Sequence, residues 1–126
     1  MNNNKLDFSP KMTEREDRAW KVLKNFPGRA AAVKSEQFEA FLEISYREFQ
    51  QIVRSLRIRH KKPIVSCGQG YYIAQTVEEK TKFAASMRSR GIADLMVASA
   101  IMGTTVEEEL RQGMLEFTRT IGGEGV

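Results

Sequence analysis

The chain has 126 residues, of which 41% are hydrophobic and 29% are charged. This composition is too apolar for a disordered chain, and the length suits one domain with its own core. The single cysteine excludes an internal disulfide and a cysteine-based metal site. The N-terminal residues lack the apolar core of a signal peptide, and no run approaches the roughly 20 apolar residues of a membrane span. We therefore expect a soluble cytoplasmic protein.

The positive charge is concentrated in one segment. The formal net charge is +4, but residues 45–75 hold six Lys or Arg against one acid, while the rest of the chain holds fourteen basic and fifteen acidic residues. A localised charge acts on a partner within about a Debye length, roughly 8 Å at physiological salt. The distribution favours a polyanion as the partner of residues 45–75.

The first expected helix follows a polar N-terminal arm, residues 1–12. Thr13 and Glu16 have the spacing of a capping box, in which each side chain accepts a hydrogen bond from the other residue's backbone amide. Apolar residues then recur at helical spacing until "PG" at 27–28, which predicts the end of the helix.

Two further helices are expected in close succession. Ser35 is placed to cap a short helix, "EQFEAFLE", and Ser45 with Glu48 forms another capping box that opens a third helix. Because the turn between the two is so short, we expect the helices to cross steeply, as in a helix-turn-helix.

The third helix has an apolar stripe and a polar stripe. The apolar stripe is expected to face the core and consists of Phe49, Ile52, Val53 and Leu56. The polar stripe has the same spacing on the other side and consists of Arg47, Gln50, Gln51 and Arg54. One side of this helix is predicted to anchor it, and the other is free for a partner.

The segment "PIVSCGQGYYIA", residues 63–74, predicts a β-hairpin with glycines where the turn requires positive φ. Cys67 is expected to be a small buried hydrophobe. Tyr71 and Tyr72 point to opposite faces of a strand, so one should pack in the core and one should face outward. The sequence does not decide which of the two is buried. Helices followed by a basic segment and a hairpin have the order of a winged helix.

The C-terminal third is predicted to be helical. Thr76 with Glu79 opens a helix that Gly91 is expected to interrupt, and Thr105 with Glu108 opens the last helix. Residues 92–102 are apolar on most sides and need cover, either from the rest of the chain or from a second copy; we favour a homodimer. The expected organisation is an arm at 1–12, a winged-helix domain at 13–75, C-terminal helices at 76–119 and a frayed tail at 120–126.

The hairpin following "ISYREFQQIVRSLR", with a later helix through "MRSR", resembles the small winged-helix proteins of bacteriophages and prophages. The resemblance covers roughly residues 35–90. It implies a mainly α fold with a small antiparallel β-hairpin, and DNA binding as the activity; many members have no assigned role. For this chain we expect a role in transcription regulation. Members of that family usually have a continuous helix where this chain has Gly91.

The predicted roles divide by position. The polar stripe of the third helix is expected to contact base edges in the major groove, because Arg pairs with guanine and Gln with adenine through two hydrogen bonds each. Backbone and wing contacts are expected from Ser45, Arg57, Arg59, Lys61, Lys62 and Gln69. The alternative for all of these residues is a solvated, solubilising surface. His60, the only histidine, is interpreted as one more polar surface residue.

Enzymatic activity is not indicated. "GQG" lacks the Lys and Ser/Thr of a phosphate-binding loop, and the acids at 107–109 suit the first turn of a helix. We expect no cofactor and no metal. The predicted partner is double-stranded DNA. The alternative hypothesis is a protein-interaction module, such as a phage-encoded inhibitor of a host protein or a packaging or replication adaptor.

Overall fold

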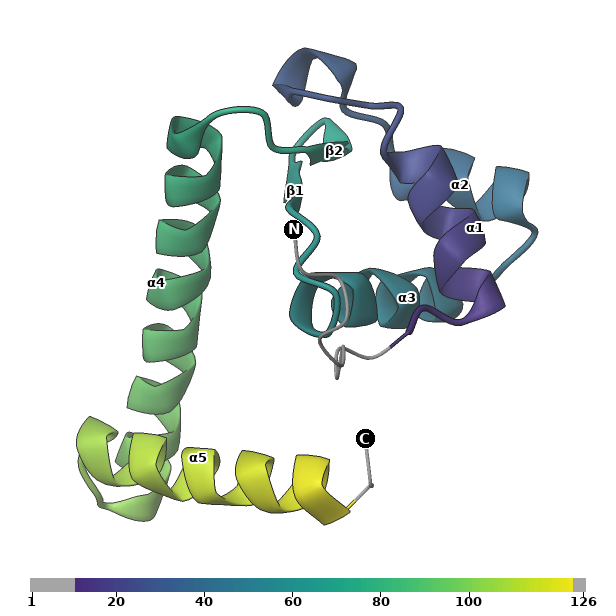
Figure 1. Cartoon of the computed structure of the whole chain (residues 1–126). Coiled ribbons are helices and arrows are strands. Elements are labelled where there is room, and N and C mark those ends of the chain that lie inside the picture. Colours follow the sequence, from purple (N-terminus) through teal and green to yellow (C-terminus); the bar gives the residue numbers. More distant parts are fainter. Residues whose placement is uncertain (1–10, 124–126) are drawn as a thin grey trace, which may run out of the picture. The chain divides into compact units, whose positions relative to one another are not determined.

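The computed structural model describes residues 11–123 and is mainly helical, with one two-stranded antiparallel sheet (Figure 1). This confirms the predicted mixture of helices and a small hairpin. In chain order the elements are α1 (Glu14–Leu23), the 3₁₀ turn η1 (Arg29–Ala31), α2 (Ser35–Leu42), α3 (Tyr46–Ile58), β1 (Ile64–Cys67), β2 (Gly70–Ile73), α4 (Val77–Met102) and α5 (Val106–Gly123). Most of the expected N-terminal arm, residues 1–10, and the last three residues of the expected tail lie outside the described part.

The chain divides into two compact units, unit 1 up to Phe83 and unit 2 from Ala84 onward. The division falls inside α4, and the domain organisation expected from the sequence, with its boundary at residue 75, stays a prediction. The first turns of α4 belong to unit 1 because Phe83 packs against the buried Val65, Tyr72 and Ala74. The two units are described separately below.

The predicted capping boxes start four helices. The hydroxyls of Thr13 and Ser45 accept hydrogen bonds from the amides three residues later, and the same exchange opens α4 and α5. Ser35 is different: it is the first residue of α2, the N-cap is Lys34, and no side chain caps this helix. Glu43, with φ of 56°, ends α2 in the left-handed conformation and allows α3 to start after a very short turn.

The core of unit 1 forms around the apolar stripe of α3. All four predicted stripe residues are buried, together with Leu23 of α1 and Phe38 of α2. The rings of Phe38 and Phe49 stack with centroids 5.5 Å apart. Met12 packs against this core, so the end of the expected arm is part of the folded unit.

The hairpin is held against the segment between α1 and α2. β1 and β2 pair with Ile64 opposite Ile73 and Cys67 opposite Gly70. Val33 and Tyr71 exchange two backbone hydrogen bonds of 2.8 and 3.0 Å. Gly70 has φ of 125°, and a Cβ on it would lie 2.2 Å from the carbonyl oxygen of Val33, so only glycine fits this close approach.

Both adjacent tyrosines pack inward, on opposite faces of β2. Tyr72 is buried in the cluster with Val65 and Ala74, whereas Tyr71 is half-buried and meets the edge of the Phe49 ring at 5.1 Å between centroids. The expectation that one of them faces outward is wrong because α3 covers one face of the hairpin and the start of α4 covers part of the other.

Unit 2 contains the rest of α4 and all of α5. α4 runs without a break through Gly91, contrary to the predicted interruption; one glycine lowers helix stability by only about 1 kcal/mol and does not by itself end a helix. α5 extends to Gly123, so the backbone at 120–123 is helical where a frayed tail was expected. Among residues 84–119 no side chain is fully buried.

Candidate nucleic-acid interface

α3 is fixed along both of its flanks. On one flank the Ser55 hydroxyl donates to Glu16 of α1 at 2.5 Å, and on the other the Gln50 amide donates to the hydroxyl of Tyr71 in β2 at 2.6 Å. The stripe between these flanks, opposite the core, is left uncovered. α3 is therefore a rigid helix with one open face.

The open face consists of four exposed residues at i, i+4, i+7 and i+11, which we name the α3 ridge: Arg47, Gln51, Arg54 and Ile58. The two arginines and the glutamine have no hydrogen-bond or ion-pair partner among the described side chains. Ile58, 43% exposed, was not singled out from the sequence, although its helical spacing from Arg54 and Arg47 is a usable signal. These side chains are free to contact a partner.

Gln50 does not belong to the ridge. Its side chain is half-buried and is committed to Tyr71. Of the four residues predicted to contact bases, three thus lie together on the open face, and the fourth joins α3 to the hairpin. The geometry does not favour base contact by Gln50.

Arg57 also turns inward. Its Nε donates to the carbonyl of Ile64 at 2.8 Å, and its guanidinium carbon lies 4.9 Å from the centroid of the Phe83 ring and 5.9 Å from that of Tyr71. Its Nη2 is buried without a hydrogen-bond partner in the described structure, and burial lowers the pKa of the guanidinium. Contact between Arg57 and phosphate is not supported by this position; the residue instead joins α3 to β1 and the start of α4.

The remaining predicted backbone contacts differ in exposure. Arg59 and Lys61 are exposed, and Lys61 has φ of 55°, which places a lysine in the left-handed region. The Nζ of Lys62 lies 4.7 Å from the centroid of the Trp20 ring, so this cation is partly held by α1. Two cations after α3 are thus fully available.

Ser45 and Glu48 form the start of α3, as predicted. Glu48 also pairs with Arg15 of α1 at 2.5 Å. The backbone amide of Ser45, with the nearby Arg15 guanidinium, holds the pKa of Glu48 below its usual value. Since Arg15 balances the only acid of α3, the charge of the helix surface is more positive than its own sequence indicates.

The hairpin turn carries one cation that the sequence did not point to. Lys34, which precedes α2, donates through Nζ to the carbonyl of Gly68 at 2.7 Å. Gln69 is exposed at the turn and accepts a hydrogen bond of 3.3 Å from the half-buried thiol of Cys67, which is therefore less enclosed than expected. No local pattern links Lys34 to Gly68, because 34 residues separate them.

His60 is not a surface residue, contrary to its interpretation from the sequence. Only 7% of its side chain is exposed, and its Nε2 lies 3.1 Å from Glu16 Oε1. Glu16 thereby connects α1 to Ser55 of α3 and to His60, two residues after the end of that helix. Burial alone would raise the pKa of Glu16, but the hydrogen bonds from Ser55, Thr13 and His60 together lower it.

No protein-family model matches the chain, and neither the curated proteins nor the solved structures include a significant match. Within residues 11–123 no group of three or more His, Cys, Asp or Glu side chains is placed to hold a metal ion. No helix in the same range combines the length and the hydropathy that crossing a membrane requires.

Proposed function

We propose that unit 1 is a winged helix that binds double-stranded DNA, with α2 and α3 as the helix-turn-helix and the β1–β2 hairpin as the wing. The order of the elements supports this assignment, as does the backbone pairing of Val33 with Tyr71, which joins the hairpin to the helical part. The resemblance to phage and prophage proteins points to the same fold, and we propose a regulator that acts by occupying a DNA site or recruiting other proteins.

The observation that carries the proposal is the α3 ridge. The major groove of B-DNA is about 12 Å wide and admits one helix, and its base edges match the side chains present. Arg47 and Arg54 suit guanine, Gln51 suits adenine, and Ile58 offers the apolar surface that a thymine methyl group contacts. In this assignment Gln50 and Arg57 position α3 against the hairpin and do not touch DNA.

Phosphate contacts are assigned to three exposed cations and one exposed amide. The cations Arg59 and Lys61 follow α3 directly, and the cation Lys34 and the amide Gln69 lie at the hairpin turn. Contacts of this kind supply affinity that depends on salt and is insensitive to sequence.

The test compares Arg54→Ala with Lys61→Ala in the full chain, on random duplex DNA and on duplexes selected from a random pool. Arg54→Ala should cost about 1–3 kcal/mol on the selected sequence and much less on random DNA. Lys61→Ala should weaken both alike and reduce the slope of log affinity against log salt by about one. Arg111→Ala, the same loss of charge in unit 2, is the control and should change neither. If Arg54→Ala weakens binding to random and selected duplexes alike, as Lys61→Ala does, base reading is removed from the proposal.

A second candidate, binding of an acidic protein surface, is favoured by one observation. Tyr46 is 59% exposed at the start of α3, and Ile58 is exposed on the ridge. Apolar residues among arginines are typical of protein interfaces. If the full chain does not bind random or selected duplexes even at low salt, this candidate replaces DNA binding.

A further inference from the structure

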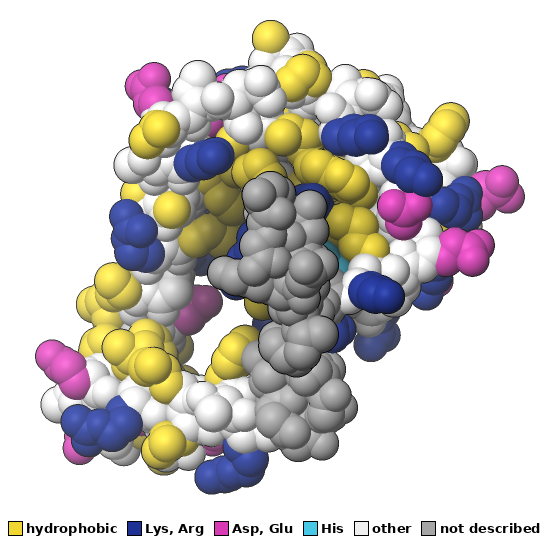
Figure 2. Space-filling view, viewed as in Figure 1, with side chains coloured by type: hydrophobic (Ala, Val, Ile, Leu, Met, Phe, Trp, Pro, Cys, Tyr) yellow, Lys and Arg dark blue, Asp and Glu magenta, His cyan; other side chains and the backbone are white. Residues whose placement is uncertain are grey.

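Unit 2 exposes far more apolar surface than a folded chain in isolation normally leaves in water. Ten large hydrophobic side chains between residues 84 and 119 are 38% to 78% exposed: Met87, Ile92, Met96, Val97, Ile101, Met102, Leu110, Met114, Leu115 and Phe117. Figure 2 shows hydrophobic side chains gathered where α4 meets α5. Contiguous apolar surface of this kind marks an interaction site.

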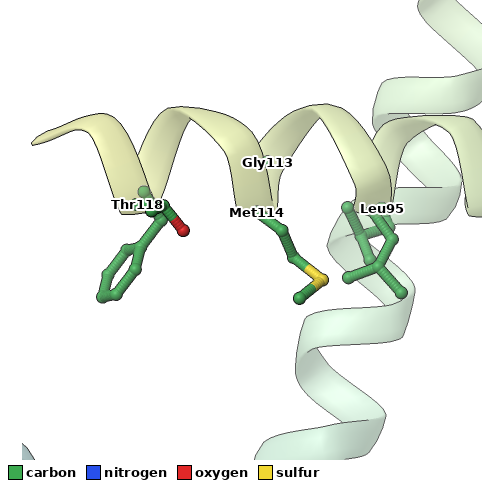
Figure 3. A pocket seen from close by; sticks show the side chains of 6 residues that line it. Leu95, Gly113, Met114 and Thr118 are labelled. Carbon is green, nitrogen blue, oxygen red and sulfur yellow. The ribbon is translucent and has the colours of Figure 1, made fainter.

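The two helices leave an open hollow between them. α5 leads away from the end of α4 and does not pack along it (Figure 1). A hollow of about 220 Å³ is lined by Leu95 of α4 and by Leu110, Gly113, Met114, Phe117 and Thr118 of α5, and Met114 points into it (Figure 3). The lining is almost entirely apolar, so it suits apolar side chains from another helix.

We propose that the occupant is unit 2 of a second copy of this chain, with the two α4 helices antiparallel. We infer a second copy as the occupant from the charges on either side of the apolar segment 92–102. Arg88 and Arg90 precede the segment, and Glu107, Glu108 and Glu109 follow it at the start of α5. An antiparallel pair related by a two-fold axis brings the basic end of each copy to the acidic end of the other.

The charged groups at these ends are available for such a contact. Arg88 and Arg90 are exposed, and neither forms an ion pair among the described residues. The carboxylates of Glu108 and Glu109 accept hydrogen bonds from Thr105 and Thr104 near the N-terminus of α5, whereas the exposed Glu107 has no such role among the described residues. A parallel pair would instead place arginines beside arginines and glutamates beside glutamates, which is unfavourable.

The apolar surface is sufficient for a stable dimer. Full burial of one Leu, Ile, Met or Phe side chain is worth about 1.5–3 kcal/mol. Because these side chains are already partly buried, covering half of the ten on each copy would gain roughly 8–15 kcal/mol, which is comparable with an association cost of roughly 4–15 kcal/mol. Nothing in this estimate depends on DNA binding, so the dimer and the proposed function fail or stand separately.

Sedimentation of the full chain without DNA tests the dimer. We expect a species of twice the 14.4 kDa chain mass. Ile101→Glu, at a position 78% exposed, should raise the dimer dissociation constant roughly 30-fold, the effect of losing a central interface residue. Val77→Glu, at an equally exposed position of α4 in unit 1, is the matched control and should leave the constant unchanged. A full chain that stays monomeric well above micromolar concentration overturns the proposal, as does a dimer that Ile101→Glu does not weaken.

Charge exchange tests the antiparallel arrangement. Arg90→Glu should weaken the dimer about fivefold, and adding Glu107→Arg to the same chain should restore it, because each copy then presents the reversed pair to the other. If the two changes each weaken the dimer and their effects on the free energy of dimerisation are additive, the antiparallel arrangement is wrong. If the full chain is monomeric and Ile101→Glu lowers its thermal stability, the apolar face is covered within one chain and the dimer proposal is wrong.

Discussion

Units 1 and 2 are built by the same local rules but differ in how they use their apolar residues. Capping boxes open α1, α3 and α4 in unit 1 and α5 in unit 2, whereas α2 has no side-chain cap, and helices in both units carry apolar residues at helical spacing. Unit 1 buries these residues around Phe38 and Phe49, whereas unit 2 leaves every one of its described side chains at least partly exposed up to residue 119. The comparison shows that helix formation and core formation are separate properties of this chain.

The largest expected effect in the comparison is that of Gly70→Ala in unit 1. Its added Cβ would meet the backbone of Val33 in a conformation that disfavours alanine, so we expect a loss of about 2–4 kcal/mol in the free energy of unfolding. Fluorescence of Trp20, the only tryptophan, during urea unfolding measures it. Gly68→Ala is the matched control: nothing lies within 4 Å of its added Cβ, and the free energy should barely change. Equal effects from both changes would mean that the hairpin is not held by Val33.

A smaller effect is expected from Glu16, the one charged residue with less than a tenth of its surface exposed among residues 11–83. Because its pKa in the folded protein lies below the unfolded value near 4.5, its contribution is present above that pH and is lost as pH falls through the folded pKa. Glu16→Gln should cost about 1–2 kcal/mol at neutral pH, and the difference from the native chain should shrink in acid.

Urea unfolding followed by Trp20 fluorescence at neutral pH and well below pH 4.5 gives this pH dependence. Glu14→Gln, an exposed acid in the same helix turn, should change the free energy by only a few tenths of a kcal/mol at either pH. A Glu16→Gln difference that is constant with pH would show that the carboxylate charge is not what stabilises the cluster with Ser55 and His60.

The smallest expected effect has the opposite sign and lies in unit 2. Gly91→Ala should stabilise α4 by about 0.5–1 kcal/mol, since alanine loses less backbone entropy and its Cβ would meet nothing within 4 Å. Slower amide hydrogen exchange in the middle of α4 of the full chain would show it. Faster exchange would indicate that another helix backbone approaches Gly91 too closely to admit a methyl group.

Features set by neighbouring residues could be predicted from the sequence. The capping boxes at Thr13, Ser45, Thr76 and Thr105 use hydrogen bonds that span three residues, and the inward stripe of α3 follows from helical periodicity. Ser35 has the right residue type for a cap but lies inside its helix. The predicted interruption at Gly91 was wrong because the helix-forming residues around it outweigh one unfavourable residue.

Features set by distant residues could not be predicted. Arg57 follows Arg54 of the ridge by three residues, a helical spacing, and carries the same charge. Its side chain turns inward because the hairpin places Ile64 and Tyr71 beside it. His60 is drawn inward by Glu16, 44 residues away in sequence. The candidate interface is therefore smaller at the end of α3 than the charge pattern indicates. It also includes Lys34, which no pattern in the sequence connects to the hairpin turn.

The attachment of the hairpin to both α3 and the α1–α2 segment has a thermodynamic consequence. Val33 pairs with β2 on its outer edge, while Gln50 and Arg57 hold the same hairpin to α3. These attachments join α3 and the hairpin into one body, so a ligand that touches both would lose little affinity to freezing internal motion. Loosening any of these attachments should weaken binding through an unfavourable entropy even where no contacting side chain has changed.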